Sequence, residues 1–194
     1  MWTWWGARSV DGMEPIEAIT AVHHPVRRRM CDYLGLHGAT QVTTLARALD
    51  QQVGSISHHL RILARAGRVE RVEDPTGDRR TSWWQLARQG MSWSAEDFPD
   101  SPADALLARE AERANVRTHV DRLRAWHHRT GSTPEWNRAA FSIDWLAWAT
   151  PEELAALSEA MRETFAAWQA GIDTDDGAER RPVFVFGHGF PTAP

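Results

Sequence analysis

Apolar residues recur at helical spacing through the first third of the chain, in short segments separated by turn residues. The pattern predicts a short helix over residues 15–22 and a second helix from Pro25 to about residue 37. Pro25 suits a first helical position, because the N–H that it lacks has no helical partner there. A third helix in TLARALD, capped by Thr43 or Thr44, is expected to bury three apolar residues: Leu45, Ala48 and Leu49.

The segment VGSISHHLRILARAGRVE, residues 53–70, has two different faces on a helical wheel. Ile56, Leu60 and Leu63 fall within a narrow arc at about 100° per residue, and Gly67 is placed to end the helix. His59 lies near the apolar edge, so it does not face the adjacent His58. The opposite face carries small, polar and basic residues, namely Gly54, Ser55, Ser57, His58, Arg61 and Arg65.

After Gly67, the stretch RVERVEDPTGDRRTSWWQLA reads as a hairpin with a charged turn that contains proline and glycine. Val69 and Val72 do not share an alternating face, so we expect a bulge or twist in the first strand. Trp84 and Leu86 share one face of the second strand and Trp83 lies on the other. Helix, helix, turn, helix and hairpin is the order of a winged helix-turn-helix, in which the last helix enters the major groove of DNA.

The second half of the chain begins with a long helical pattern that Ser101 can cap and that contains no proline between Pro102 and Gly131. At about 1.5 Å per residue, this helix would be on the order of 40 Å long. Such a helix is too long to be buried against a small winged-helix domain. We therefore favour a subunit contact, over an intramolecular packing helix, for its stripe of Val116, Val120, Leu123 and Trp126 or His127.

Residues 139–190 contain two segments with strand character on either side of a capped helix. AAFSIDWLAW and PVFVFGHGF predict strands, and TPEEL opens a helix with Thr150 as cap and Glu153 completing a capping box. The predicted fold class is thus mostly α with short β: a winged helix-turn-helix over residues 14–90, a linker over 91–100, and a dimerisation and effector-binding region over 101–194. That region is expected to be the long helix plus a small α/β unit.

Charge is distributed unevenly along a chain whose formal net charge is -4. Residues 21–90 hold 11 arginines and 6 acidic residues, a local balance of +5, which leaves the remainder at -9. A basic segment inside an acidic protein is typical of a nucleic-acid-binding module joined to a partner domain. The sequence shows neither a secretory signal nor a membrane span, so we expect a cytoplasmic protein. A single cysteine, Cys31, excludes an intramolecular disulfide.

The motifs HHPVRRRMCDYL, TTLARAL, GSISHHLRILARAGRVE and GDRRTSWWQL closely resemble the ArsR-type winged-helix transcriptional regulators. The resemblance covers about residues 16–87. It implies a dimeric bacterial regulator that binds palindromic operator DNA, with a reading helix over residues 53–66 and a wing tip over residues 74–80. Two departures stand out: Asp50 and Gln52 occupy places where the family often has glycine and serine, and the paired-cysteine metal box of metal-sensing members has no counterpart.

These observations predict a sequence-specific repressor that binds double-stranded DNA as a homodimer, needs no cofactor and is not an enzyme. The expected DNA contacts are Gln52, Ser55, Ser57, His58, Arg61, Arg65, Arg79 and Arg80. A regulator without metal cysteines needs another input, so we expect a small apolar or aromatic effector in a pocket lined by some of Trp126, Trp136, Trp145, Trp148 and Trp168. The alternatives are a protein-binding adaptor that has lost DNA contact and a metal sensor that uses His23, His24, His119, His127 and His128.

Overall fold

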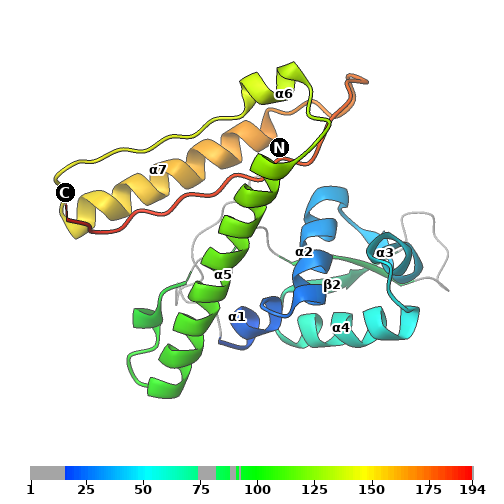
Figure 1. The fold of residues 1–194 in the computed structure, drawn as a ribbon. Helices are drawn as coiled ribbons and strands as arrows, with labels where there is room; N and C mark the ends of the chain where they lie inside the picture. The colour runs from blue at the N-terminus through cyan, green and yellow to red at the C-terminus, as the bar shows by residue number, and fades with distance from the viewer. Residues whose placement is uncertain (1–15, 74–81, 88–90, 92, 194) are drawn as a thin grey trace. The chain divides into compact units, whose positions relative to one another are not determined.

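The computed structural model describes residues 16–73, 82–87, 91 and 93–193 of the chain. Eight helical segments and a small sheet follow one another along it (Figure 1). The chain divides into two units, with the boundary inside the long helix α5 between residues 122 and 123. Each unit is described separately below.

The first unit opens with three helices whose bounds agree closely with the sequence pattern: α1 (Ile16–Val22), α2 (Pro25–His37) and α3 (Val42–Leu49). Pro25 does occupy the first turn of α2. The cap of α3 was predicted wrongly at Thr43 or Thr44, because the N-cap is Gln41, which makes no side-chain cap hydrogen bond. The buried set was also partly wrong, since α3 buries Leu45, Ala46 and Leu49 and exposes Ala48.

Helix α4 (Val53–Arg65) follows α3 after a tight turn, and strands β2 (Val69–Val72) and β3 (Trp83–Leu86) then form an antiparallel hairpin. The short strand β1 (Thr40–Gln41), which the sequence pattern did not predict, pairs with β3 and gives the order β1-β3-β2. The expected bulge is absent from the described pairs, because residues 69–72 pair in unbroken register with residues 86–83. Trp84 and Leu86 pack against the core, which is one of the two orientations that the alternation of the strand left open.

Two apolar clusters hold the first unit together. The larger one joins α2, α3, α4 and β2, and its fully buried members include Met30, Leu34, Leu45, Ile56, Leu60 and Leu63. The smaller one packs Ile19 of α1 against Ala95 and Phe98, in and beside the short 3-10 helix η1 (Ala95–Asp97), and against Ala108 and Ala111 of α5 (Pro102–His128). The predicted linker therefore contributes two residues to a core.

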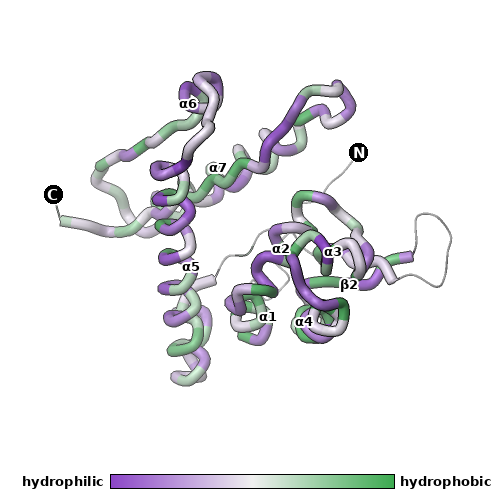
Figure 2. Tube along the Cα trace, turned by 45° about the vertical axis from the view of Figure 1, so that its right-hand side comes forward, coloured by the Kyte–Doolittle hydropathy of each residue, from purple (hydrophilic) through white to green (hydrophobic). Residues whose placement is uncertain are grey.

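The second unit contains α6 (Pro134–Ala139), α7 (Pro151–Ala170) and long segments without regular secondary structure. Thr150 and Glu153 form the predicted capping box at the start of α7. The expected α/β unit is wrong, because residues 140–150 and 179–193 form no strand. No described residue from 123 to 193 is buried. Apolar residues nevertheless recur along α7 and the segments beside it (Figure 2).

Candidate nucleic-acid interface

The turn between α3 and α4 sets the direction of the second helix. Asp50 adopts a left-handed conformation, with φ 53° and ψ 55°, and the N–H of Gln51 bonds the Ala46 carbonyl at 2.9 Å. Aspartate tolerates this conformation better than most residues, because its short polar side chain can bond nearby backbone. Gln52 is the N-cap of α4 but its side chain makes no cap hydrogen bond, whereas a serine at this position could accept one from the helix backbone.

Helix α4 presents one buried and one exposed face, as its sequence predicts. Ile56, Leu60 and Leu63 are completely buried, while His58 and Arg61 are exposed on the other side. The Arg61 Nε donates to the Ser57 carbonyl oxygen at 3.2 Å, and the side chain is exposed. Ser55 and Ser57 are half-buried beside this face. A Cβ added at Gly54 would meet no atom within 4 Å, so the start of α4 is also open.

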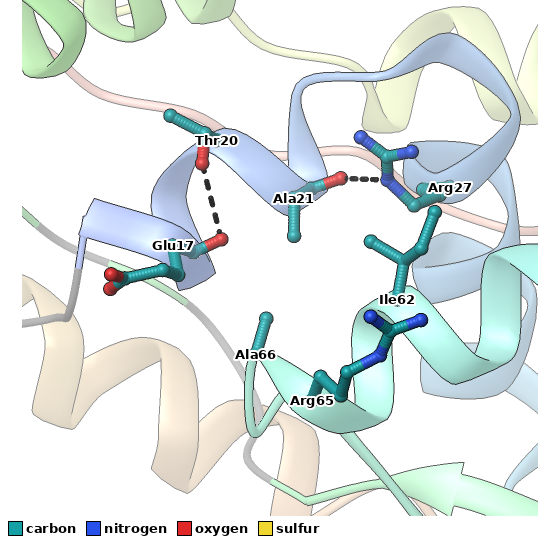
Figure 3. A pocket seen from close by; sticks show the side chains of 7 residues that line it. All are labelled: Glu17, Thr20, Ala21, Arg27, Ile62, Arg65 and Ala66. Atoms are coloured by element: carbon teal, nitrogen blue, oxygen red, sulfur yellow. Dashed lines mark hydrogen bonds between the residues drawn. The ribbon is translucent and has the colours of Figure 1, made fainter.

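Arg65 is exposed, but it lines an open cavity of about 350 Å³ between α1 and α4 (Figure 3). Ala21, Ile62 and Ala66 form apolar walls, and Arg27 lies across from Arg65. Arg27 Nε donates to the Ala21 carbonyl oxygen and is thereby held at the cavity edge. Of the basic residues expected on α4, Arg61 therefore lies clear of neighbouring helices, whereas Arg65 lies beside α1.

Histidines connect the start of α2 with α4. His24 Nδ1 accepts a hydrogen bond from the Val26 N–H at 3.2 Å, and its ring centroid lies 4.7 Å from that of His59. The pKa values of His24 and His59 are lowered, first by burial, and also by the charge of Arg27. The lowered pKa values favour uncharged imidazoles, which can pack against each other without charge repulsion. Within the described part of the chain, no group of three or more His, Cys, Asp or Glu residues is placed to hold a metal ion.

The hairpin carries polar contacts between its two strands. Arg71 Nη2 donates to Ser82 Oγ at 2.6 Å, and Gln85 Nε2 donates to Glu70 Oε1 at 2.7 Å. These exposed pairs connect β2 to the chain around β3 near the wing. The predicted wing contacts Arg79 and Arg80, together with the wing tip over residues 74–80, lie outside the described residues.

Val53 is a candidate contact that the sequence pattern missed. It is 47% exposed at the first position of α4, beside the open Gly54. An exposed aliphatic side chain there suits apolar contact with a thymine methyl group. The period of α4 places Val53 near the apolar stripe, so the wheel alone gave no signal. Only the absence of a packing neighbour at the helix start reveals its exposure.

The five tryptophans expected around an effector occur in the second unit and at the end of α5, in different environments. Trp145 and Trp148 are 90% and 97% exposed in the segment before α7, and Trp168 is about half exposed. The Arg129 guanidinium lies over the Trp126 ring, and the Arg181 guanidinium lies 5.8 Å from the Trp136 ring centroid. None of the five lines the cavity in Figure 3.

Comparison with known proteins supports the assignment of the first unit. Residues 22–72 match the model of a helix-turn-helix domain family. The comparison with curated proteins found no match to this chain. Among solved structures, the chain is similar to an apo double mutant of Lactococcus lactis ZitR, with 13% identity, a TM-score of 0.35, and 79% of this chain and 89% of that chain covered.

Two further similar structures are RV1404 from Mycobacterium tuberculosis and Streptococcus pneumoniae FabT in complex with DNA. RV1404 has 18% identity and a TM-score of 0.33, with 82% of this chain and 85% of that chain covered. FabT has 15% identity and a TM-score of 0.31, with 80% and 86% covered. These likenesses are weak, so the assignment depends on the family match.

The family match and the exposed face of α4 lead to one conclusion. The chain carries a helix-turn-helix domain over residues 22–72 and is a DNA-binding transcriptional regulator. This agrees with the function class that the sequence predicts. In the described part of the chain, no helix has the length and apolar character needed to cross a bilayer.

Proposed function

We propose that the chain is a homodimeric repressor that recognises palindromic operator DNA through α4. The observation that carries this proposal is the division of α4 into two faces. Ile56, Leu60 and Leu63 are fully buried, so the helix is held by one side only. The other side presents Arg61, His58 and the open Gly54, a small and basic surface that suits close approach to base edges.

Arg61 is the residue best placed to read a base. Its terminal nitrogens can form two parallel hydrogen bonds to O6 and N7 of guanine. Gln52 and Val53 lie at the start of the same helix and Ser55 and Ser57 lie beside its face, so they are expected to contact bases or phosphates nearby. Arg79 and Arg80 of the wing are expected to contact phosphates.

Dimerisation is supported by the second unit. Its described residues include fifteen large apolar side chains that are more than a third exposed, among them Leu157, Phe165 and Trp168 of α7. A segment that buries nothing gains too little hydrophobic free energy to offset the conformational entropy lost on ordering. A second copy supplies the missing partner surface, and a two-fold dimer would present two reading helices to successive turns of DNA.

The response to a small apolar or aromatic ligand stays a prediction. The five tryptophans do not enclose a pocket within a single chain, since Trp145, Trp148 and Trp168 are exposed. Histidine-based metal sensing stays the alternative, and metal analysis of protein purified without a histidine tag tests it. Binding of zinc with His23 and His24 as ligands would favour this alternative.

Selection of bound sequences from random duplex DNA tests the main proposal. We expect an enriched motif made of two inverted half-sites whose centres are about 10 bp apart, or a multiple of that spacing. A single half-site without symmetry would contradict the dimer and preserve DNA reading, whereas no enrichment would contradict specific binding altogether. Repression is tested by placing the selected site over a reporter promoter, where the chain should lower expression and an Arg61→Ala variant should not.

A further inference from the structure

A second cavity, of about 240 Å³, lies between α2 and α5 in the first unit. Arg28, Arg29 and Asp32 line it from α2, Thr118 and Arg122 line it from α5, and His23 lies at its edge beside the start of α2. It is separate from the exposed face of α4 and from the cavity in Figure 3.

The lining carries an excess of positive charge. Three guanidinium groups share it with one carboxylate, that of Asp32, which is ion-paired with Arg122. The other two arginines bond neutral oxygens: Arg28 Nη2 donates to Asn115 Oδ1 at 2.6 Å, and Arg29 Nη2 donates to the Leu49 carbonyl at 3.2 Å. Two positive charges therefore remain without a matching negative charge in the lining.

These charges are costly where they are partly removed from water. Burial lowers the pKa of Arg28, and although Asp32 raises it, the nearby Arg122 lowers it again. Close cationic groups in a partly buried site are stabilised when an anion lies between them. Arginine is also the side chain best suited to hold an oxyanion, because its planar fork can donate two parallel hydrogen bonds.

A buried nitrogen at the same site has no partner. The Nε2 atom of His23 is buried and makes no hydrogen bond to any described residue. Buried polar atoms in folded proteins normally have a partner, and His23 is among the residues that line the cavity, so a small group bound there could supply one. The pKa of His23 is lowered to about 4, first by burial and then by Arg28. The ring is therefore neutral near pH 7, and Nε2 can donate a hydrogen bond.

We propose that the cavity between α2 and α5 binds a small oxyanion, a phosphate or a carboxylate, through Arg28 and Arg122 with His23 as an additional donor. The bound anion would offset the excess charge and satisfy the orphan nitrogen. It would also connect α2, which packs in the helix-turn-helix core, to the long helix α5. The inference depends only on residues of the first unit and does not require the DNA-binding proposal.

Thermal unfolding of the full chain with inorganic phosphate or sodium acetate, at constant ionic strength in chloride, tests this site. A ligand that binds only the folded state raises the melting temperature. We expect at least one of the two anions to raise it by about 3–6 °C when present at roughly ten times its dissociation constant. The phosphate and acetate series distinguish a phosphate site from a carboxylate site.

Arg28→Gln and Arg122→Gln should lose the shift, and Arg113→Gln provides the matched control. Arg113 is an exposed arginine on α5 outside the cavity, so its variant should respond like the original chain. Two cavity variants are used because one of them could fail to fold, which circular dichroism would reveal. An equal shift in all variants would assign binding to another surface and overturn the proposal, as would the absence of any shift with both anions.

Discussion

The imidazole of His23 meets the indole of Trp93 edge-on, with ring centroids 5.4 Å apart and ring planes at 77°. Trp93 in turn donates from Nε1 to the Ala108 carbonyl of α5 at 3.3 Å. The junction between α1 and α2 is thereby packed against the segment that leads into α5. This contact requires a neutral imidazole, because a charged ring here would be partly buried beside Arg28.

Stability should therefore fall at acid pH through His23. Its pKa is about 4 in the fold, against an ordinary value of 6.5, so the unfolded chain binds more protons between these values. The contribution is fully present above pH 6.5 and is lost as the pH falls toward 4. Urea denaturation measures the free energy of unfolding at both pH values. It should be lower at pH 5 than at pH 7 by on the order of 1 kcal/mol because of His23, after discounting for solvent screening. His23→Gln should reduce the pH dependence, whereas His37→Gln, at an exposed site, should leave it unchanged.

Leu60 should be among the residues most sensitive to truncation. It is completely buried where α4 meets the main core, so Leu60→Ala leaves a cavity and is expected to lower the free energy of unfolding by about 2–5 kcal/mol. Leu106→Ala is the matched control, because Leu106 is 61% exposed on α5 and its truncation should change stability by no more than about 0.5 kcal/mol. Equal losses in urea denaturation would contradict the assignment of the core.

The first unit was predictable because its elements are specified by local pattern. The buried stripe of α4, the proline at the start of α2 and the paired face of Trp84 and Leu86 depend on residues a few positions apart. Strand β1 was missed because two residues cannot show an alternating pattern, and its pairing with β3 depends on a segment more than forty positions away.

The strands expected in the second unit are absent, because an alternating pattern does not by itself provide a second strand to pair with. Phe141, Ile143 and Trp145 do alternate with polar residues, yet no neighbouring strand pairs with them and all three are exposed. The pattern on α4 is limited in the same way, because it does not reveal which other elements of the fold lie beside a residue. A helical wheel placed Arg65 with Arg61, but it could not show that α1 lies beside Arg65.

Arg61 should contribute strongly and specifically to DNA binding. If it reads a base, Arg61→Ala is expected to weaken binding by about 1–3 kcal/mol at the selected operator and to relax preference at one position. If it contacts phosphate instead, affinity should fall uniformly across sequences and the salt slope should decrease by about 1. Fluorescence anisotropy with operator and scrambled duplexes at several salt concentrations separates the two. Arg113→Ala on α5 serves as control, and an equal loss in that variant would indicate only a general charge effect.

Dimerisation should depend on the apolar side of α7. Leu157 is 55% exposed in one chain, and burying a leucine contributes about 1.5–3 kcal/mol. A symmetric interface loses two copies at once, so Leu157→Glu should raise the dimer dissociation constant by at least about 100-fold. Sedimentation velocity over a concentration series measures this, with Glu163→Gln on the same helix as control. A chain that stays monomeric without any substitution, or a Leu157→Glu variant that dimerises normally, would refute the proposed interface.

Trp145 and Trp148 should report any apolar effector, because they are the most exposed of the five tryptophans and such side chains emit at long wavelength in water. Enclosure by a ligand and a second copy would remove water from the indoles, so titration with toluene or cyclohexanol should shift the emission to shorter wavelength and change the affinity for operator DNA. Trp148→Phe should diminish the optical change, and Trp83→Phe in β3 is the control for an unrelated indole. Since a ligand can alter DNA binding only through different affinities for two states, a spectral shift with unchanged operator affinity would identify binding without regulation. If neither the tryptophan emission nor the operator affinity changes, the effector hypothesis is refuted.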